Sequence, residues 1–406
     1  MGGPLLLRDH AGVPVLPPVR PVRQGRGRAV VSGDEASGER LAARPAPAVG
    51  TLSTARARII EALGEQGGLT RLVLAGALLA GALWALNGSP FLNLVGQACA
   101  VYAIASIGQS VLIGSAGQIA LSGAAFMAIG AFVTGTLAGT PLETFPVPLV
   151  VCAVTGWLVG LLSGIPGLRF RGLYLLLSSL ALQFMVTAIT KNYQSEYHPA
   201  GLVVPPLHIG SLDVSAGRSL YAVLIAILAV VYLVVALTER TGIGLAWRSI
   251  RESEVAAAVS GVDVVRWKLY AFAASGSITA VAGSLLAYLV GRADYATYDL
   301  NLSIALITMI FIGGVRSRLG ALTGAVVITA LPYVLQLRLS GWLTELGLSA
   351  NWYTENQSIA NAGLFSLLFL LVVLFEPEGI EGLLGKAERL LRRAFGARRG
   401  GRPAES

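Results

Sequence analysis

The sequence has little charge and few of the side chains that bind metals or carry out acid–base catalysis. Only 13% of its 406 residues are Asp, Glu, Lys or Arg, whereas soluble domains carry about 25%. The three histidines show no spacing typical of metal ligands. The two cysteines, Cys99 and Cys152, both lie inside apolar stretches, where small packing residues are common. The sequence therefore predicts no metal site and no disulfide framework.

Motifs for nucleotide binding and hydrolysis are also missing. No G-x-x-x-x-G-K-(S/T) pattern occurs, and the nearest string, GIEGLLGKA, has the wrong spacing and lacks the Ser or Thr. The patterns H-E-x-x-H and G-x-S-x-G are absent as well. Carboxylates are nearly absent from the apolar stretches, although proton-driven carriers keep such groups for function. The sequence thus predicts no catalytic residue, no cofactor held by this chain and no proton coupling within it.

The sequence contains instead a series of apolar stretches long enough to cross a bilayer. Hydrophobic residues make up 54% of the chain, and a helix of about 20 apolar residues spans the hydrocarbon core. We expect an all-α, polytopic membrane protein with about ten transmembrane helices within a permease domain at 69–378. The expected spans are 71–87, 91–113, 118–138, 147–167, 172–190, 219–237, 269–290, 301–314, 319–337 and 360–376.

The polar segments predict the domain ends and the orientation. Residues 1–68 predict a disordered, basic N-terminal extension, and 379–406 predict a basic amphipathic tail at the membrane surface. If the N-terminus is cytoplasmic and the spans alternate, most Lys and Arg residues lie inside, as is typical of cytoplasmic loops. The outside segments then hold only Lys191, Arg218, Arg292 and Arg338. We therefore expect both ends in the cytoplasm, and this asymmetry explains the net charge of +8 without a nucleic-acid partner.

Glycine-containing polar segments interrupt the apolar stretches at two corresponding places. One break, 114–118, lies within 107–132, and the other, 313–318, lies within 307–332. Paired broken helices in two repeat-like halves are typical of transporters with a central path. The alternative is that both breaks are tight turns between spans. The candidate path residues are Gly114, Gly117, Gln118, Ser122, Gly313 and Gly314.

Glycines also recur every four residues within two of the expected spans. One series is Gly156, Gly160 and Gly164, and the other is Gly320 and Gly324. Small residues at this spacing let membrane helices approach closely. We interpret both series as helix-packing surfaces, which need no functional role.

The polar loop 239–268 is long enough to hold one or two short helices. Within it, the small residues 256–258 are followed by Gly261, which predicts a helix with a small face that ends at the glycine. Such a helix can dock in a groove on a soluble partner. The alternative is a solvated loop whose arginines set the orientation. The charged residues around it are Arg248, Arg251, Glu252 and Glu254.

Four blocks of the chain occur in the order and at the spacing of a known transporter family. They are LIGSAGQIALSGAAFMAIGAF, FRGLYLLLSSLALQ, AAAVSGVDVVRWKLYAFAASGSITAVAGSLLAY and FIGGVRSRLGALTGAVVITALP. As a set they resemble the permease subunits of branched-chain amino acid ABC importers, of the LivM type. The resemblance covers about residues 90–376.

The resemblance implies a subunit of the bacterial plasma (inner) membrane that works with other proteins. The expected partners are a second, LivH-type permease, two cytoplasmic ATPases that use ATP and Mg, an external substrate-binding protein and membrane lipid. The implied activity is uptake of branched-chain amino acids into the cytoplasm by ATP-driven alternating access. The resemblance also assigns coupling with the ATPases to the segment 250–262. The candidate coupling residues are Arg251, Glu252, Ala256, Ala257 and Gly261.

The chain departs from the family in ways that leave other substrates open. EYHPAGLVVPPLHIG follows the fifth span, where the family commonly has a Gly-rich segment with Asp or Asn, and Ser122 and Gly123 stand where it often has a His. Urea and short-chain amide importers use similar permeases, so a urea, amide or simple-sugar permease is one alternative. Alternatives of another kind are a secondary carrier, which moves solute unaided, and a membrane-embedded enzyme, which requires clustered His, Asp or Glu.

Overall fold

The structure is a computed structural model that describes residues 88–169, 173–209, 212–213, 217–315, 317–345 and 363. All of these residues belong to one compact unit, Arg56–Ser406. Several expected segments lie outside the described residues. They are the extension 1–68, the span 71–87, the tail 379–406 and, apart from residue 363, the span 360–376.

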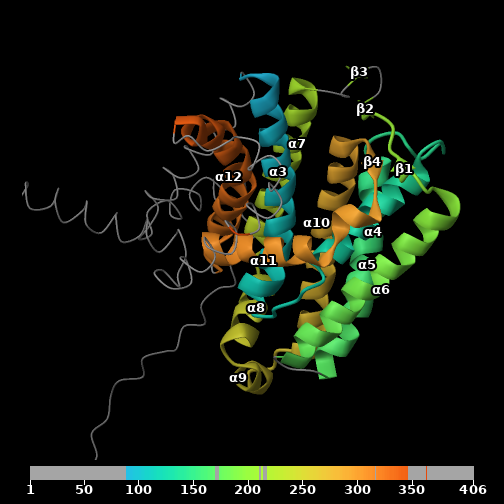
Figure 1. Ribbon diagram of the computed structural model, residues 1–406. Coiled ribbons are helices and arrows are strands. Elements are labelled where there is room, and N and C mark those ends of the chain that lie inside the picture. Colours follow the sequence, from blue (N-terminus) through green and yellow to red (C-terminus); the bar gives the residue numbers. More distant parts are fainter. Residues whose placement is uncertain are drawn as a thin grey trace, which may run out of the picture. The chain divides into compact units, whose positions relative to one another are not determined.

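The described part of the chain is built mainly from helices (Figure 1). The longer helices are α3 (Pro90–Ser110), which continues as the π-helix η1 (Val111–Ser115), α5 (Val147–Arg169), α6 (Leu173–Tyr197), α7 (Arg218–Thr238), α10 (Val264–Val290) and α12 (Arg318–Glu345). The shorter ones are α4 (Gly123–Leu137), α8 (Gly242–Glu252), α9 (Glu254–Val259), the 3₁₀ helix η2 (Tyr295–Tyr298) and α11 (Leu300–Gly313). Short antiparallel pairs join β1 (Leu202–Val203) to β4 (Arg292–Ala293) and β2 (His208–Ile209) to β3 (Leu212–Asp213).

Five helices in the described part are long and apolar enough to cross a membrane. They are Pro90–Ser115, Val147–Pro166, Tyr174–Tyr197, Arg218–Thr238 and Val264–Val290. Shorter apolar helices are Gly123–Leu137, Leu300–Gly313 and Arg318–Tyr333. The predicted all-α, polytopic membrane architecture is therefore confirmed for the described residues, while the number of about ten spans stays a prediction.

The predicted span 118–138 is wrong in its first part. Residues 118–122 are not helical, and α4 begins at Gly123. The chain leaves the helical path at Gly117, whose φ of +70° is costly for other residues. A helix of 15 residues rises about 22 Å, which is less than the ~30 Å of a hydrocarbon core. A non-helical segment therefore leads the chain from η1 to a short helix within the bundle.

Other boundaries also differ from the sequence-based expectation, and α12 continues to Glu345 instead of ending at 337. Helix α6 continues to Tyr197 instead of ending at 190, and its additional two turns are stabilised by the Gln194 side chain, which accepts a hydrogen bond from Tyr295 N at 2.8 Å. Helix α10 begins at Val264 instead of 269, since the Asp263 carboxylate caps it by accepting from Arg266 N at 3.2 Å. Side chains, and not hydropathy, set these ends of α6 and α10.

Polar side chains inside the bundle stabilise the start of α4. Ala124 N donates to Ser303 Oγ of α11 at 2.9 Å, and Ala125 N donates to Gln183 Oε1 of α6 at 2.6 Å. Gln183 Nε2 also donates to Tyr298 O, at the end of η2 and two residues before α11, at 3.1 Å. In an apolar interior every backbone amide needs a protein partner. These contacts therefore place the first turns of α4 and α11 beside each other.

The glycine series bring pairs of helices into close contact, as predicted. A Cβ atom at Gly156 would lie 2.5 Å from Gly276 O, and one at Gly160 would lie 2.6 Å from Phe272 O, both on α10. Gly320 and Gly324 of α12 pack in the same way against the end of α11. Since lipid gives helices no hydrophobic drive to associate, such close approach provides the packing.

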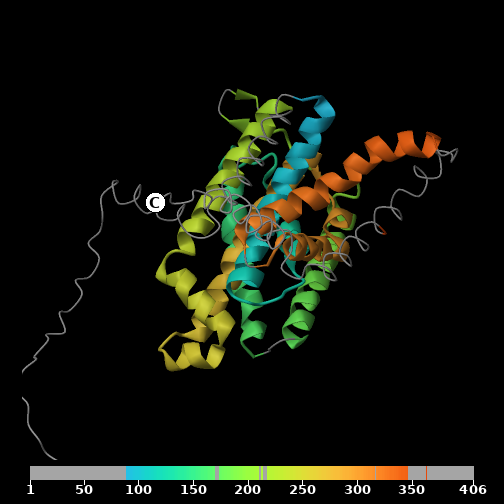
Figure 2. The same cartoon turned by 90° about the vertical axis from the view of Figure 1, so that its left-hand side faces the viewer.

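The loops of the described region gather at two opposite ends of the bundle (Figure 1). Helices α8 and α9 lie at one end, here called the α9 end, and the paired strands lie at the other, here called the strand end. In Figure 2, α12 crosses α3 obliquely, and these two helices are in contact. The loop predicted to be cytoplasmic, 239–268, therefore lies opposite the strand-containing loop predicted to be external.

We expect Gly160→Ala to lower the thermal stability of the purified chain in detergent. Its Cβ would meet backbone atoms of α10, and overpacking of this kind costs about 1–3 kcal/mol. The matched control is Gly242→Ala, because Gly242 starts α8 with no atom within 4 Å of an added Cβ. Equal unfolding midpoints for the two variants would contradict close packing of α5 on α10.

Candidate functional site

The two breaks in the apolar stretches are in direct contact. Gly114 lies in η1, and a Cβ atom there would collide with the carbonyl oxygen of Val315 in the second break. In that second break, Gly314 adopts a φ of +119°, and its N–H donates to Ile310 O at 2.9 Å, which ends α11. Gly313, directly before it, packs against Gly320 of α12. Two segments 200 residues apart in sequence therefore meet, and glycine is what permits their approach.

Arg251 of α8 contacts the first break. Its guanidinium donates a hydrogen bond to the carbonyl oxygen of Gly114. A Cβ atom at Gly117 would lie 2.5 Å from Arg251 Cγ, so the arginine side chain covers this glycine. Arg251, a candidate coupling residue, thus contacts Gly114 and Gly117, two candidate path residues. The sequence analysis predicted the coupling residues and the path residues as two separate groups.

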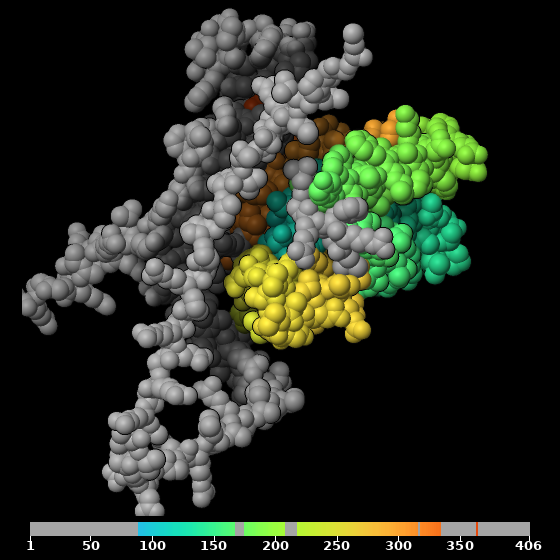
Figure 3. All heavy atoms as spheres, turned by 90° about the horizontal axis from the view of Figure 1, so that it is seen from below, coloured from blue at the N-terminus to red at the C-terminus, as the bar shows by residue number. Residues whose placement is uncertain are grey.

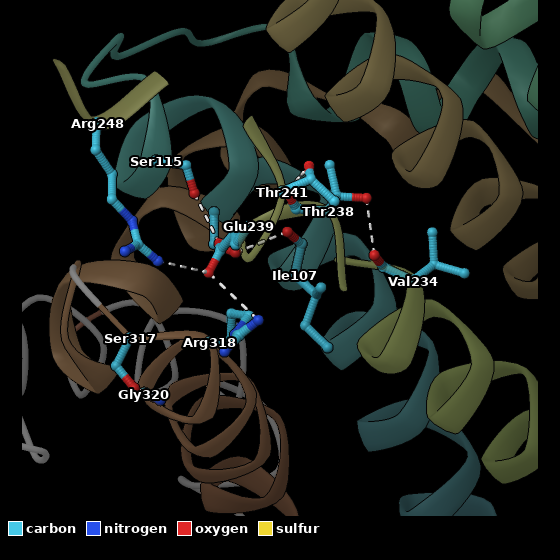
Figure 4. A network of polar contacts seen from close by, with 11 residues as sticks. Ile107, Ser115, Val234, Thr238, Glu239, Thr241, Arg248, Ser317, Arg318 and Gly320 are labelled. Atoms are coloured by element: carbon cyan, nitrogen blue, oxygen red, sulfur yellow. Dashed lines mark hydrogen bonds and ion pairs between the residues drawn. The ribbon is translucent and has the colours of Figure 1, made fainter. Parts of the chain in front are cut away.

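A group of charged and polar residues, the Glu239 cluster, joins the same region to two further helices (Figure 4). It consists of Ser115, Glu239, Arg248 and Arg318. Ser115 Oγ donates to Glu239 Oε1 at 2.8 Å, and Oε2 of that carboxylate lies 3.3 Å from Arg318 Nη1 and 4.0 Å from Arg248 Nη2. The side chains of Glu239 and Arg318 are only 13% and 21% exposed. Screening by solvent and salt is weak at such positions.

Two contacts fix α8 and α9 on α10. Trp247 Nε1 donates to Trp267 O at 2.9 Å, and Lys268 Nζ lies 2.5 Å from Glu254 Oε1. The Lys268 side chain is 8% exposed, so this charge pair is largely removed from solvent. Residues Gly242–Val259 therefore form a unit attached to α10 as well as to the breaks.

Helix α9 ends as the sequence predicts. Ser253 caps its start by accepting from Ala256 N at 3.3 Å. At its end, Gly261 adopts a φ of +84°, its N–H donates to Ala258 O at 3.1 Å, and Val262 N donates to Ala257 O at 3.0 Å. This pair of hydrogen bonds is a Schellman motif, which favours glycine. The predicted helix with a glycine stop is confirmed, and Gly261 has a conformational role.

The outer face of α8 and α9 is exposed at the α9 end, where these residues are drawn in yellow (Figure 3). We call it the α9 surface and define it by Glu252, Val255, Ala256 and Val259. Val255 is 68% exposed and Val259 is 85% exposed, whereas Ala257 is buried. Of the five candidate coupling residues, Glu252 and Ala256 thus belong to an exposed surface, while Ala257 and Arg251 face the bundle.

The remaining candidate path residues carry buried polar atoms. Gln118 and Ser122 are 6% and 0% exposed, and their side-chain polar atoms have no hydrogen-bond partner among the described residues. The same holds within the described region for Gln109, Ser275 and Thr279, on α3 and α10. Burial of polar groups is costly unless they are hydrogen-bonded. These neutral donors and acceptors can bind water or a polar solute within the apolar bundle.

Sequence reasoning missed Glu239 and Arg318 as a pair, and it missed Gln109, Ser275 and Thr279. A signal existed for the first two, because Glu239 lies two residues after one expected span and Arg318 directly precedes another. The three polar residues stand within apolar stretches and are marked only by their polarity. No group of His, Cys, Asp or Glu within the described ranges could hold a metal ion.

A family model described as "Branched-chain amino acid transport system / permease component" matches residues 90–375. The chain belongs to this family. The match includes both breaks, the Glu239 cluster and the α9 surface, and it confirms the resemblance derived from the four sequence blocks. The family is one of transport permeases, which agrees with the expectation that the chain is not an enzyme.

Two curated relatives are similar to the chain at low identity. They are the high-affinity branched-chain amino acid transport system permease proteins LivM of Salmonella typhimurium, 26% identical, and of Escherichia coli, 25% identical. Each match extends over 253 residues, which is 56% of this chain and 60% of the relative. The chain thus spans less than two thirds of the length of these relatives. No solved structure matches.

A double-mutant cycle on the purified chain tests the Glu239 cluster. We expect Glu239→Gln and Arg318→Gln to show a coupling free energy of about 1–3 kcal/mol in unfolding, because either single change removes the nearest ionic partner of a poorly solvated charge. The control is the pair Asp263 and Arg266, which lies at 3.0 Å but is 48% and 77% exposed. An exposed pair contributes less than about 1 kcal/mol, so equal coupling in the two cycles would contradict the assigned burial.

Proposed function

We propose that the chain is a membrane-spanning permease subunit of an ABC importer, and that it moves branched-chain amino acids into the cytoplasm by ATP-driven alternating access. The family match over residues 90–375 carries this proposal. The names of the two LivM relatives support the substrate class. In this proposal the chain resides in the bacterial plasma membrane with both ends in the cytoplasm.

The proposal requires partners, since the sequence has no P-loop for ATP. They are two cytoplasmic ATPases that use ATP and Mg, a second LivH-type permease and an external substrate-binding protein. The α9 surface supports docking of the ATPases, because it exposes apolar residues such as Val259 at one end of the bundle. Glu252 and Ala256 lie on this surface, while Arg251, Ala257 and Gly261 fix its geometry.

The proposed solute path runs past the first break. Gln118 and Ser122 offer neutral hydrogen-bonding groups in an apolar surrounding. Such a surrounding suits an amino acid whose ammonium and carboxylate groups form hydrogen bonds and whose side chain is apolar. Gly114, Gly117, Gly313 and Gly314 hold the two breaks against each other and against Arg251. Displacement of these contacts would open or close the route in alternating access.

Uptake by proteoliposomes tests the proposed function. Vesicles that contain the chain with the proposed second permease, ATPases and binding protein are expected to accumulate radiolabelled leucine when ATP is supplied. Vesicles with the chain alone are expected to accumulate none. Uptake by the chain alone would identify a secondary carrier instead, and ATP-dependent uptake of urea without leucine would assign the other substrate class.

We expect Val259→Asp to abolish association with the ATPases, because docking would bury an unpaired charge. That penalty exceeds about 1.4 kcal/mol, which corresponds to at least a tenfold loss of affinity. Copurification of the ATPases with the tagged chain measures the effect. The control is Val203→Asp at the strand end, where Val203 is 76% exposed. Retention of the ATPases by both variants would show that the α9 surface is not their docking site.

A further inference from the structure

Glu239 occupies the junction between the last turn of α7 and the start of α8. Its carboxylate contacts residues from three separate segments: Ser115 of the first break, Arg318 at the start of α12 and Arg248 of α8 (Figure 4). Ser115 and Arg318 lie 124 and 79 positions away in sequence. A single side chain therefore connects the unit beneath the bundle with both broken regions.

The contacts of Glu239 act together with other contacts on the same segments. Arg251, one turn after Arg248 on α8, donates to Gly114 O, next to Ser115. The Arg318 guanidinium also lies over the Tyr232 ring of α7, with Cζ 5.7 Å from its centroid. Gly114 also touches Val315, so the first and second breaks are in direct contact. The contacts of Glu239 and Arg251 therefore link α8 to both breaks.

The attachment of α8 and α9 to α10 follows a different route. It uses the Trp247–Trp267 hydrogen bond and the Lys268–Glu254 ion pair, neither of which involves a residue of the breaks. Loss of the Glu239 carboxylate would therefore leave the α9 surface in place on α10. Its effect would be confined to the connection between that surface and the two breaks.

We propose that Glu239 is a positioning residue that couples the α8–α9 unit to both breaks. This inference rests on the proposed function for its consequence in transport. The charge of Glu239 is required to convert ATP hydrolysis into solute movement, and it is not required for assembly with the ATPases. Arg318 and Ser115 are the groups through which it acts on the second and the first break.

Amide hydrogen exchange on the purified full-length chain tests the contact itself, without any partner subunit. Glu239→Gln is expected to speed exchange in the peptides containing Ser115 and in those containing Arg318. Ser115→Ala removes one hydrogen bond and keeps both ion pairs, so it is expected to speed exchange in the first peptides alone. This graded pair keeps the inference testable if Glu239→Gln folds poorly. Unchanged exchange around Ser115 in both variants would overturn the inference.

A transport experiment on the assembled complex in proteoliposomes tests the consequence. Glu239→Gln is expected to retain bound ATPases and ATP hydrolysis, while leucine uptake per ATP hydrolysed falls by at least about fivefold, the lower range of coupling between distant sites. Glu239→Asp, which keeps the charge, is expected to recover part of the uptake. The control Asp263→Asn removes an exposed carboxylate of the same region and is expected to change nothing.

The possible results separate the two proposals. If wild-type vesicles show no ATP-dependent uptake, the proposed function fails, while the exchange experiment still decides the role of Glu239. If wild-type vesicles transport and Glu239→Gln leaves uptake per ATP unchanged, the positioning role is overturned. A parallel fall of ATP hydrolysis and uptake also overturns it, because such a loss reflects assembly and not coupling.

Discussion

Backbone groups that leave a helix inside an apolar bundle need hydrogen-bond partners from the protein, and this constraint organises the whole described region. At the start of α4, backbone N–H groups donate to the side chains of Ser303 and Gln183. In the first break, the carbonyl oxygen of Gly114 accepts from Arg251. Each partner comes from a different helix. The backbone groups at the start of α4 and in the first break are therefore held by side chains from three other helices.

Local features of the fold were predictable from the sequence because their causes are local. The apolar stretches, the glycine series at 156–164 and the stop at Gly261 each depend on residues a few positions apart. The non-helical segment 118–122 and the extended end of α6 were not predictable in the same way. The first is held by Ser179, which accepts from Leu121 N at 2.9 Å, and the second by Asp294 and Tyr295, which contact Gln194. These partners lie some 60 to 100 positions away and leave no periodic pattern in the sequence.

The candidate site likewise has features that depend on nearby residues and features that depend on residues distant in sequence. The candidate path residues could be chosen from the sequence because glycine and polar residues interrupt apolar stretches there. The similar arrangement of the two breaks was the only sequence feature that placed them near a common path. Nothing local indicated that Arg251 covers Gly117, or that Glu239 accepts from Ser115 at 2.8 Å. A charged residue at the end of an apolar stretch is usually read as a topological marker. Burial of Glu239 to 13% exposure is what distinguishes it from such a marker.

The two kinds of contact in the bundle suit different parts of a transport cycle. Glycines of α5 pack directly against the backbone of α10, since a Cβ atom added at Gly156 would lie 2.5 Å from Gly276 O. Such a close-packed interface cannot slide without steric conflict. Ion pairs and hydrogen bonds at the breaks can instead exchange partners with little change in volume. Helices α5 and α10 therefore form one closely packed body, and a hydrogen bond and an ion pair attach the α8–α9 unit to it. In the alternating access proposed above, the Glu239 cluster and the breaks that it contacts are the polar contacts that would rearrange.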